Sequence, residues 1–158
     1  MDAQRNRQAV DRWFRAFNAK QFDKLAALLA DIANDDVIQE WPQSGERIRG
    51  KDNIMAVLQN YPGLPQATVS GLRGSEDNWV LTPSWTPLRI IGTGDHYTLE
   101  GWVAYPTGEV WNVIDLFDFR DGKLIKVTEY FAAPFPAAEW RAKWVERFDP
   151  PTHLRSEA

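Results

Sequence analysis

Residues 111–131 read WNVIDLFDFRDGKLIKVTEYF, and this stretch predicts two paired β-strands. Before the central turn, apolar side chains recur at every second position, as they do in a strand that buries one face. The turn residues Asp121-Gly122 are a strong hairpin signal, because both tolerate the positive φ angles of a tight turn. We therefore expect strands at about 109–119 and 124–131, joined by this turn.

One carboxylate interrupts the apolar face of the first of these strands. Alternation places Asp115 on the same face as four large apolar side chains, those of Trp111, Val113, Phe117 and Phe119. An ionised carboxylate among such neighbours is costly to desolvate, so it needs a hydrogen-bond donor, a raised pKa or an opening to water. The placement is typical of an acid–base or ligand-binding site, and a hydrogen-bonded structural Asp is the alternative.

The rest of the chain predicts helices first and strands afterwards. Helical periodicity and a short strand-like run indicate three helices at about 3–19, 22–32 and 51–61, and one strand at 37–41. Residues 44–47 read as a loop. Three further strand-like runs, separated by turn residues, lie at about 67–73, 79–91 and 96–105. This order predicts an α+β domain in which the last four strands form an antiparallel meander.

A last helix is predicted after these strands. Pro136 is well placed to begin it, and Trp140, Trp144 and Phe148 then repeat at every fourth residue. We expect this aromatic stripe to pack on its own domain, with a partner protein as the alternative.

Composition indicates a soluble protein of one domain. The 158 residues are 44% hydrophobic and 25% charged, with a net charge of −4 and no block of Lys or Arg, which argues against a nucleic-acid or anionic-membrane partner. No cysteine is present for a disulfide or a thiolate metal site. The polar start is no signal peptide, and no apolar run approaches the roughly 20 residues of a membrane span, so we expect a cytoplasmic protein. Eight tryptophans suggest a wide aromatic-walled interior or an interface.

The ordered set of elements resembles a known superfamily. The residues that carry the resemblance are Asp35-Asp36-Val37, Pro42, Gly45, Gly50 and Ile54, then Val113-Ile114-Asp115, Asp121-Gly122-Lys123 and Tyr130-Phe131. Together they resemble the nuclear transport factor 2-like superfamily, and most closely its SnoaL-like and ketosteroid-isomerase-like members. The resemblance implies a cone-shaped α+β barrel over residues 3–148, in which a strongly bent, mostly antiparallel sheet wraps the N-terminal helices, with a C-terminal helix and a flexible tail at 149–158. It also implies a homodimer through the outer sheet face.

The resemblance places Asp115 where ketosteroid isomerases hold a protonated Asp in an oxyanion hole. The two other members of that site are absent. Trp41 stands at the position of the general base, and Trp13 matches the position of the tyrosine donor. An indole cannot take a proton from carbon, so steroid-type isomerisation by that mechanism is not expected.

A second carboxylate is predicted to join Asp115. Alternation puts Glu129 on one face with Phe131, and the resemblance turns that face toward the pocket, unless a bulge in the strand turns Glu129 outward. Several carboxylates in one cavity cannot all ionise, so at least one pKa would rise. We expect Asp115 and Glu129 to be the catalytic pair. The expected substrate-binding residues are Trp13, Phe17, Trp41, Glu100, Trp102, Trp111, Val113 and Phe131, with Glu100 and Trp102 on the inward face of their strand.

These residues predict cofactor-independent acid–base catalysis on a small hydrophobic molecule, by isomerisation, hydration–dehydration or aldol-type cyclisation. No cofactor or metal is expected, because His96 and His153 lie at a turn edge and in the tail. The alternatives are a non-catalytic small-molecule binder and a dimeric protein-interaction module, because this fold hosts many functions. An open cavity of several hundred Å³ reaching Asp115 would favour an enzyme or binder, and a filled interior with an exposed apolar sheet patch would favour the interaction module.

Overall fold

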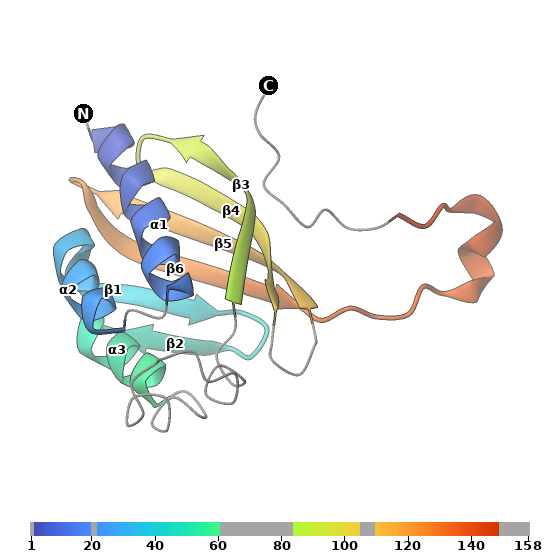
Figure 1. Ribbon diagram of the computed structural model, residues 1–158, viewed down its shortest axis with the longest axis horizontal. Coiled ribbons are helices and arrows are strands. Elements are labelled where there is room, and N and C mark those ends of the chain that lie inside the picture. The colour runs from blue at the N-terminus through green and yellow to red at the C-terminus, as the bar shows by residue number, and fades with distance from the viewer. Residues whose placement is uncertain (1, 20–21, 61–83, 105–109, 149–158) are drawn as a thin grey trace.

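A strongly curved six-stranded sheet forms the body of the molecule, and helix α1 (Asp2–Asn18) crosses its concave face (Figure 1). The computed structural model describes residues 2–19, 22–60, 84–104 and 110–148. The remaining elements, in chain order, are α2 (Phe22–Ile32), β1 (Ala33–Trp41), β2 (Glu46–Arg49), α3 (Lys51–Gln59), β3 (Ser84–Thr93), β4 (His96–Ala104), β5 (Val110–Arg120), β6 (Lys123–Ala132) and the short 3₁₀ helix η1 (Glu139–Trp144). The predicted α+β class, with helices before the main sheet, is confirmed.

The sheet has the strand order β2-β1-β6-β5-β4-β3. Strands β3 to β6 form the expected antiparallel meander, whereas β1 pairs with β6 in parallel. Residues 44–47 were expected to be a loop, but β2 starts within them and pairs with β1. The turn between them is closed by backbone hydrogen bonds from Ser44 and Gly45 to the Trp41 carbonyl, and Gly45 adopts a φ of 73°. The predicted strand at 67–73 lies outside the described residues.

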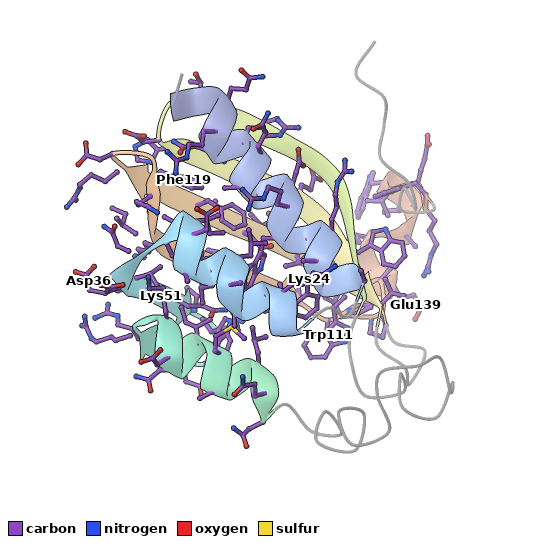
Figure 2. All side chains as sticks on the ribbon, turned by 60° about the vertical axis from the view of Figure 1, so that its left-hand side comes forward. Lys24, Asp36, Lys51, Trp111, Phe119 and Glu139 are labelled. Carbon is purple, nitrogen blue, oxygen red and sulfur yellow. The ribbon has the colours of Figure 1, made fainter. Side chains whose placement is uncertain are left out.

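The hairpin of β5 and β6 has the predicted alternation. Val113, Asp115, Phe117 and Phe119 are buried on the concave face, and Trp111 is half-buried there. Trp111 and Phe119 mark the two ends of this row (Figure 2). The core forms where these side chains meet the helices, and the rings of Phe14 and Phe117 pack edge to face with centroids 6.0 Å apart.

A bulge in β6 decides which of its residues face inward. The register shifts between Asp118 and Phe119, so that Leu124 pairs with Phe119 and is buried, whereas Ile125 is the extra residue of the bulge. Beyond the bulge, Val127, Glu129 and Phe131 pair with Phe117, Asp115 and Val113. The bulge lies between Glu129 and the Asp121-Gly122 turn, so it does not turn the Glu129 side chain outward. Glu129 faces the inside of the sheet, as predicted.

Helix α3 covers β1 and β2 at one end of the sheet. Its Ile54 and Met55 are buried, while Val57 is exposed. Lys51, which begins this helix and is labelled in Figure 2, forms an ion pair with Asp35 at 2.6 Å. None of the helices in the described residues combines the length and the apolar character needed to cross a membrane.

The segment after β6 leaves the body of the molecule instead of packing on it (Figure 1). The predicted helix from Pro136 is wrong: the chain is extended until Glu139 and then forms only the six-residue η1. The prediction that its aromatic stripe packs on its own domain is also wrong, because Trp140, Trp144 and Phe148 are between 69% and 81% exposed. Residues 133–148 are called the C-terminal arm below.

The fold predicts unequal costs for two matched Val→Ala substitutions. Val37 is fully buried in β1, whereas Val57 is exposed on α3. Val37→Ala should lower the free energy of unfolding by about 2 kcal/mol, because each buried methylene-sized group contributes about 0.8 kcal/mol and a cavity adds to the loss. Val57→Ala should change it by no more than about 0.5 kcal/mol. Urea denaturation measures both, and equal losses would contradict this assignment of the core.

Candidate functional site

Glu129 receives two hydrogen bonds from the neighbouring strand. Parallel pairing of β1 with β6 sets Gln39 opposite Val127, so that Gln39 and Trp41 reach the inner face beside Glu129. Gln39 Nε2 donates to Glu129 Oε2 at 2.7 Å, and the indole Nε1 of Trp41 donates to the same oxygen. Burial raises the pKa of Glu129, and the two donors act against this rise because they stabilise the charged form.

Asp115 lies next to Glu129, but its carboxyl group is not hydrogen-bonded to any of the described residues. It stands between Leu99 of β4 and Glu129 of β6 in the sheet register, and its side chain is 0% exposed. Neither carboxyl oxygen has a hydrogen bond in the described part of the chain. Burial raises the pKa of Asp115 well above its ordinary value, and the negative charge of Glu129 raises it further.

The two carboxyl groups therefore have different surroundings, although burial raises the pKa of both. Directly opposed residues of an antiparallel pair have Cβ atoms about 4.5–5.5 Å apart, too close for two buried charges to coexist cheaply. Glu129 has donors that hold its charge, and Asp115 has none. The arrangement sets a carboxyl group with two hydrogen-bond donors on β6 beside one on β5 that has none among the described residues.

A cavity of about 40 Å³ opens beside Glu129. Trp13 and Gln39 also line it, and the rest of its wall is apolar, from α1, α2, α3 and the inner sheet face. Asp115 is not among the lining residues. This volume has room for a few water molecules at most, so the described residues do not enclose the cavity of several hundred Å³ that an enzyme or binder was expected to have.

A larger open groove lies elsewhere, between α1 and α2. It has a volume of about 640 Å³, and Arg12, Arg15 and Lys24 line it together with Asp31. Neither carboxylate of the candidate pair borders this groove. It is therefore separate from the site around Glu129.

The predicted substrate-binding residues fall into three groups: those at the site, those in or against the core, and those on the outer face of the sheet. Trp13 lines the cavity, and Trp41 contacts Glu129 directly. Phe17 and Val113 are buried in the core, and Trp111 and Phe131 are partly buried against it. The role of Gln39 was not foreseen from the sequence. Its only signal is that it shares a strand face with Trp41, two positions along β1.

Glu100 and Trp102 do not face the site. Glu100 pairs with Ile114, and Trp102 pairs with Asn112, so both point to the convex outer face of the sheet. The inward prediction was wrong because the strand buries its other face, where Tyr97 is 4% and Leu99 0% exposed. The expected third carboxylate is therefore absent, and the site is a pair. Within the described residues, no three His, Cys, Asp or Glu side chains group so as to hold a metal ion.

The buried Asp115 predicts a pH-dependent difference in stability between the wild type and Asp115→Asn. In the unfolded chain an Asp ionises near pH 3.9, whereas in the folded protein the pKa of Asp115 is raised. Its contribution to stability is therefore fully present below about pH 4 and is lost as the pH rises toward the folded pKa. The free energy of unfolding of the wild type should fall relative to that of Asp115→Asn between pH 4 and 7.

Chemical denaturation of both proteins across this pH range measures the difference. The matched control is Asp36→Asn, which replaces an exposed Asp of β1 and should change stability by no more than about 0.5 kcal/mol. A constant difference between the wild type and Asp115→Asn from pH 4 to 7 would show that Asp115 ionises normally in the folded state.

Comparison with known proteins places this geometry in a family. The chain resembles a solved NTF-2 like protein of unknown function from Burkholderia xenovorans LB400, with 30% identity over 92% of this chain and 97% of the other and a TM-score of 0.68. It also resembles a "putative ketosteroid isomerase" from Kribbella flavida, with 20% identity, coverage of 99% and 98%, and a TM-score of 0.73. An LEH-like epoxide hydrolase of M. tuberculosis has 17% identity, coverage of 83% and 85%, and a TM-score of 0.55.

The last two similarities show the fold alone. No curated protein matches this chain significantly in sequence. The family model of the SnoaL-like domain matches residues 10–127, from Val10 within α1 to Val127 of β6, which is well over half of the chain. The chain therefore belongs to the SnoaL-like domain family, with the α+β fold of nuclear transport factor 2-like proteins.

Proposed function

We propose that the chain is an enzyme that moves a proton on a small hydrophobic molecule without a cofactor, with Glu129 as the base and Asp115 as the acid. The observation that carries this proposal is the pairing of a hydrogen-bonded carboxylate with a fully buried carboxyl group that lacks partners. A base and an acid of raised pKa, side by side, supply what proton transfer near neutral pH requires.

The proposed step is proton abstraction next to a carbonyl group. The Glu129 carboxylate takes a proton from the carbon adjacent to the carbonyl, and the electron pair of that bond shifts toward the carbonyl oxygen. Asp115 donates a hydrogen bond or its proton to this oxygen, which provides the acceptor that Asp115 lacks in the free protein. Return of a proton to a different carbon gives isomerisation, and attack of the enol on a second carbonyl gives cyclisation. Loss of a hydroxyl group from the neighbouring carbon, which Asp115 would protonate as it leaves, gives dehydration.

The position of the base supports this assignment over a steroid-type site. Trp41 stands where the resemblance expects the general base, and its indole can only donate. It donates to Glu129, so we place the proton acceptor on the adjacent strand β6 and not on β1. Gln39 and Trp41 are positioning residues in this proposal, because they orient the carboxylate and favour its charged form.

The small cavity is the outcome that was expected for an interaction module and not for an enzyme or binder, so the catalytic proposal requires side chains around the cavity to move when a substrate binds. A cavity of about 40 Å³ is far smaller than the roughly 300–1,000 Å³ of ordinary small-molecule sites. The half-buried ring of Trp13 borders it, and a rotation of this ring would enlarge it. The mostly apolar wall favours a hydrophobic substrate whose C–H group lies at Glu129. The same movement must also open the cavity to Asp115, so that this residue can reach the carbonyl oxygen.

We also propose that the chain forms a homodimer through the convex outer face of its sheet. The cross-strand pair Ile114 and Tyr130 is 45% and 44% exposed at the centre of this face. The neighbouring Trp102 and Leu116 point the same way. These four residues are called the outer patch, and apolar groups gathered in this way are typical of an interaction site.

Deuterium exchange tests the catalytic proposal with simple ketones as probe substrates. A panel of hydrophobic cyclic ketones and enones is incubated with the protein in D₂O, and NMR records exchange at the carbons next to the carbonyl. At least one ketone should exchange faster than in buffer. Glu129→Gln should reduce this catalysed rate by about 10²–10⁴-fold, the usual contribution of a positioned base. Asp115→Asn should retain ketone binding and lose most of the rate.

The matched control is Glu46→Gln, which changes an exposed carboxylate of β2 outside the site and should leave the rate unchanged. Ketones that bind without exchange would contradict catalysis and identify a non-catalytic binder. Equal rates for the wild type and Glu129→Gln would eliminate Glu129 as the base.

A further inference from the structure

The C-terminal arm exposes more aromatic surface than any element of the body described in the structure. Four of its large aromatic side chains are between 69% and 81% exposed, namely those of Phe135, Trp140, Trp144 and Phe148. Lys143 Nζ lies 4.0 Å from the centre of the Trp144 ring, a contact made within the arm itself. Exposed aromatic groups of this size are costly in water and are the residues that anchor protein interfaces.

The start of the arm explains why it points away from its own sheet. Ala133 and Phe135 each precede a proline, and residues before proline favour extended backbone. Residues 133–138 carry no helix or strand pairing, and in extended form six residues reach about 20 Å. The arm therefore acts as a short stiff spacer that carries its aromatic residues away from the end of β6 (Figure 1).

The outer patch begins where the arm begins. Asn112 pairs with the last residue of β6, Ala132, and the next outward-facing pair on these two strands is Ile114 and Tyr130. On the opposite side, the patch is bordered by charged groups: Lys126 forms an ion pair with Glu40 at 2.6 Å, and Asp118 contacts His96. Glu100, which pairs with Ile114, also points to this face. One chain thus presents an aromatic arm and, adjoining it, a sheet face of mixed apolar and polar groups with a charged margin.

We infer that the C-terminal arm crosses to a second copy of this chain and packs against the outer sheet face there, so that the dimer exchanges its arms. This inference rests on the proposed outer-face dimer and adds the arm to it. A two-fold pairing satisfies both surfaces at once, because each copy gives one arm and receives one. Large aromatic side chains bury about 150–250 Å² each, so eight of them would contribute on the order of 1,200–2,000 Å², a range that includes the roughly 1,600 Å² of a stable interface.

Photo-cross-linking of the full-length chain tests the exchange. The exposed Ala142, between the two tryptophans of η1, is replaced by benzoylphenylalanine, and this protein is mixed with an affinity-tagged wild-type chain. Irradiation should join tagged and untagged chains, and mass spectrometry should locate the cross-link on β4, β5 or β6 of the tagged copy. Cross-links only within one chain, or only to surfaces other than the sheet, would overturn the inference.

Light scattering on arm variants completes the test. Trp140→Ser/Trp144→Ser should weaken dimerisation by at least about 100-fold, since buried tryptophans at interface centres each contribute a large share of affinity. The matched control, Glu139→Gln/Glu146→Gln, changes two exposed arm residues and should leave the dimer intact. A wild-type dimer that the tryptophan variant retains would overturn arm exchange while keeping the dimer. A wild-type monomer at tens of micromolar would overturn both.

Discussion

Two carboxyl groups face one another across β5 and β6 on the inside of a curved sheet, and the chemistry of the site depends on their proximity. Asp115 and Glu129 are paired in the register, so neither can leave the other without breaking the sheet. Two charges at this separation in an apolar interior would repel strongly. Burial raises the pKa of both groups, and the two donors from β1 act against this rise at Glu129. This constraint is the basis of the proposal that Asp115 acts as the acid and Glu129 as the base.

Those donors reach Glu129 only because of the long-range order of the sheet. β1 is separated from β6 by about 80 residues of sequence, yet it pairs with β6 in parallel and brings Gln39 and Trp41 to the carboxylate. The outer side of β4, β5 and β6 carries the outer patch. The sheet thus supports two proposals at once, with proton transfer on its concave face and dimerisation on its convex face. The arm, which continues directly from β6, connects the second proposal to the strand that bears the base.

Local sequence patterns could predict part of this arrangement. The position of Asp115 followed from alternation alone, because one face of its strand is much more apolar than the other. Alternation also favours burial of Tyr97 and Leu99 in strand 96–105, and placing Trp102 inward was the error. Pairing of Leu99 with Asp115 decides the facing. The contribution of Gln39 depends on a parallel pairing that leaves no local signal. The aromatic spacing at 140–148 is compatible with a helix. Pro134 and Pro136 favour extended backbone before it, and without a surface of the domain to pack on, only the short η1 forms.

Site-resolved titration of the two carboxyl groups tests the central claim most directly. Carbon-13 NMR of the side-chain carboxyls, assigned with Asp115→Asn and Glu129→Gln, follows each group separately as the pH changes. The account predicts that Glu129 loses its proton first and that Asp115 stays protonated at pH values where exposed aspartates have ionised, because burial and the Glu129 charge raise the pKa of Asp115. Ionisation of Asp115 in the ordinary range of an exposed Asp, or before Glu129, would contradict it.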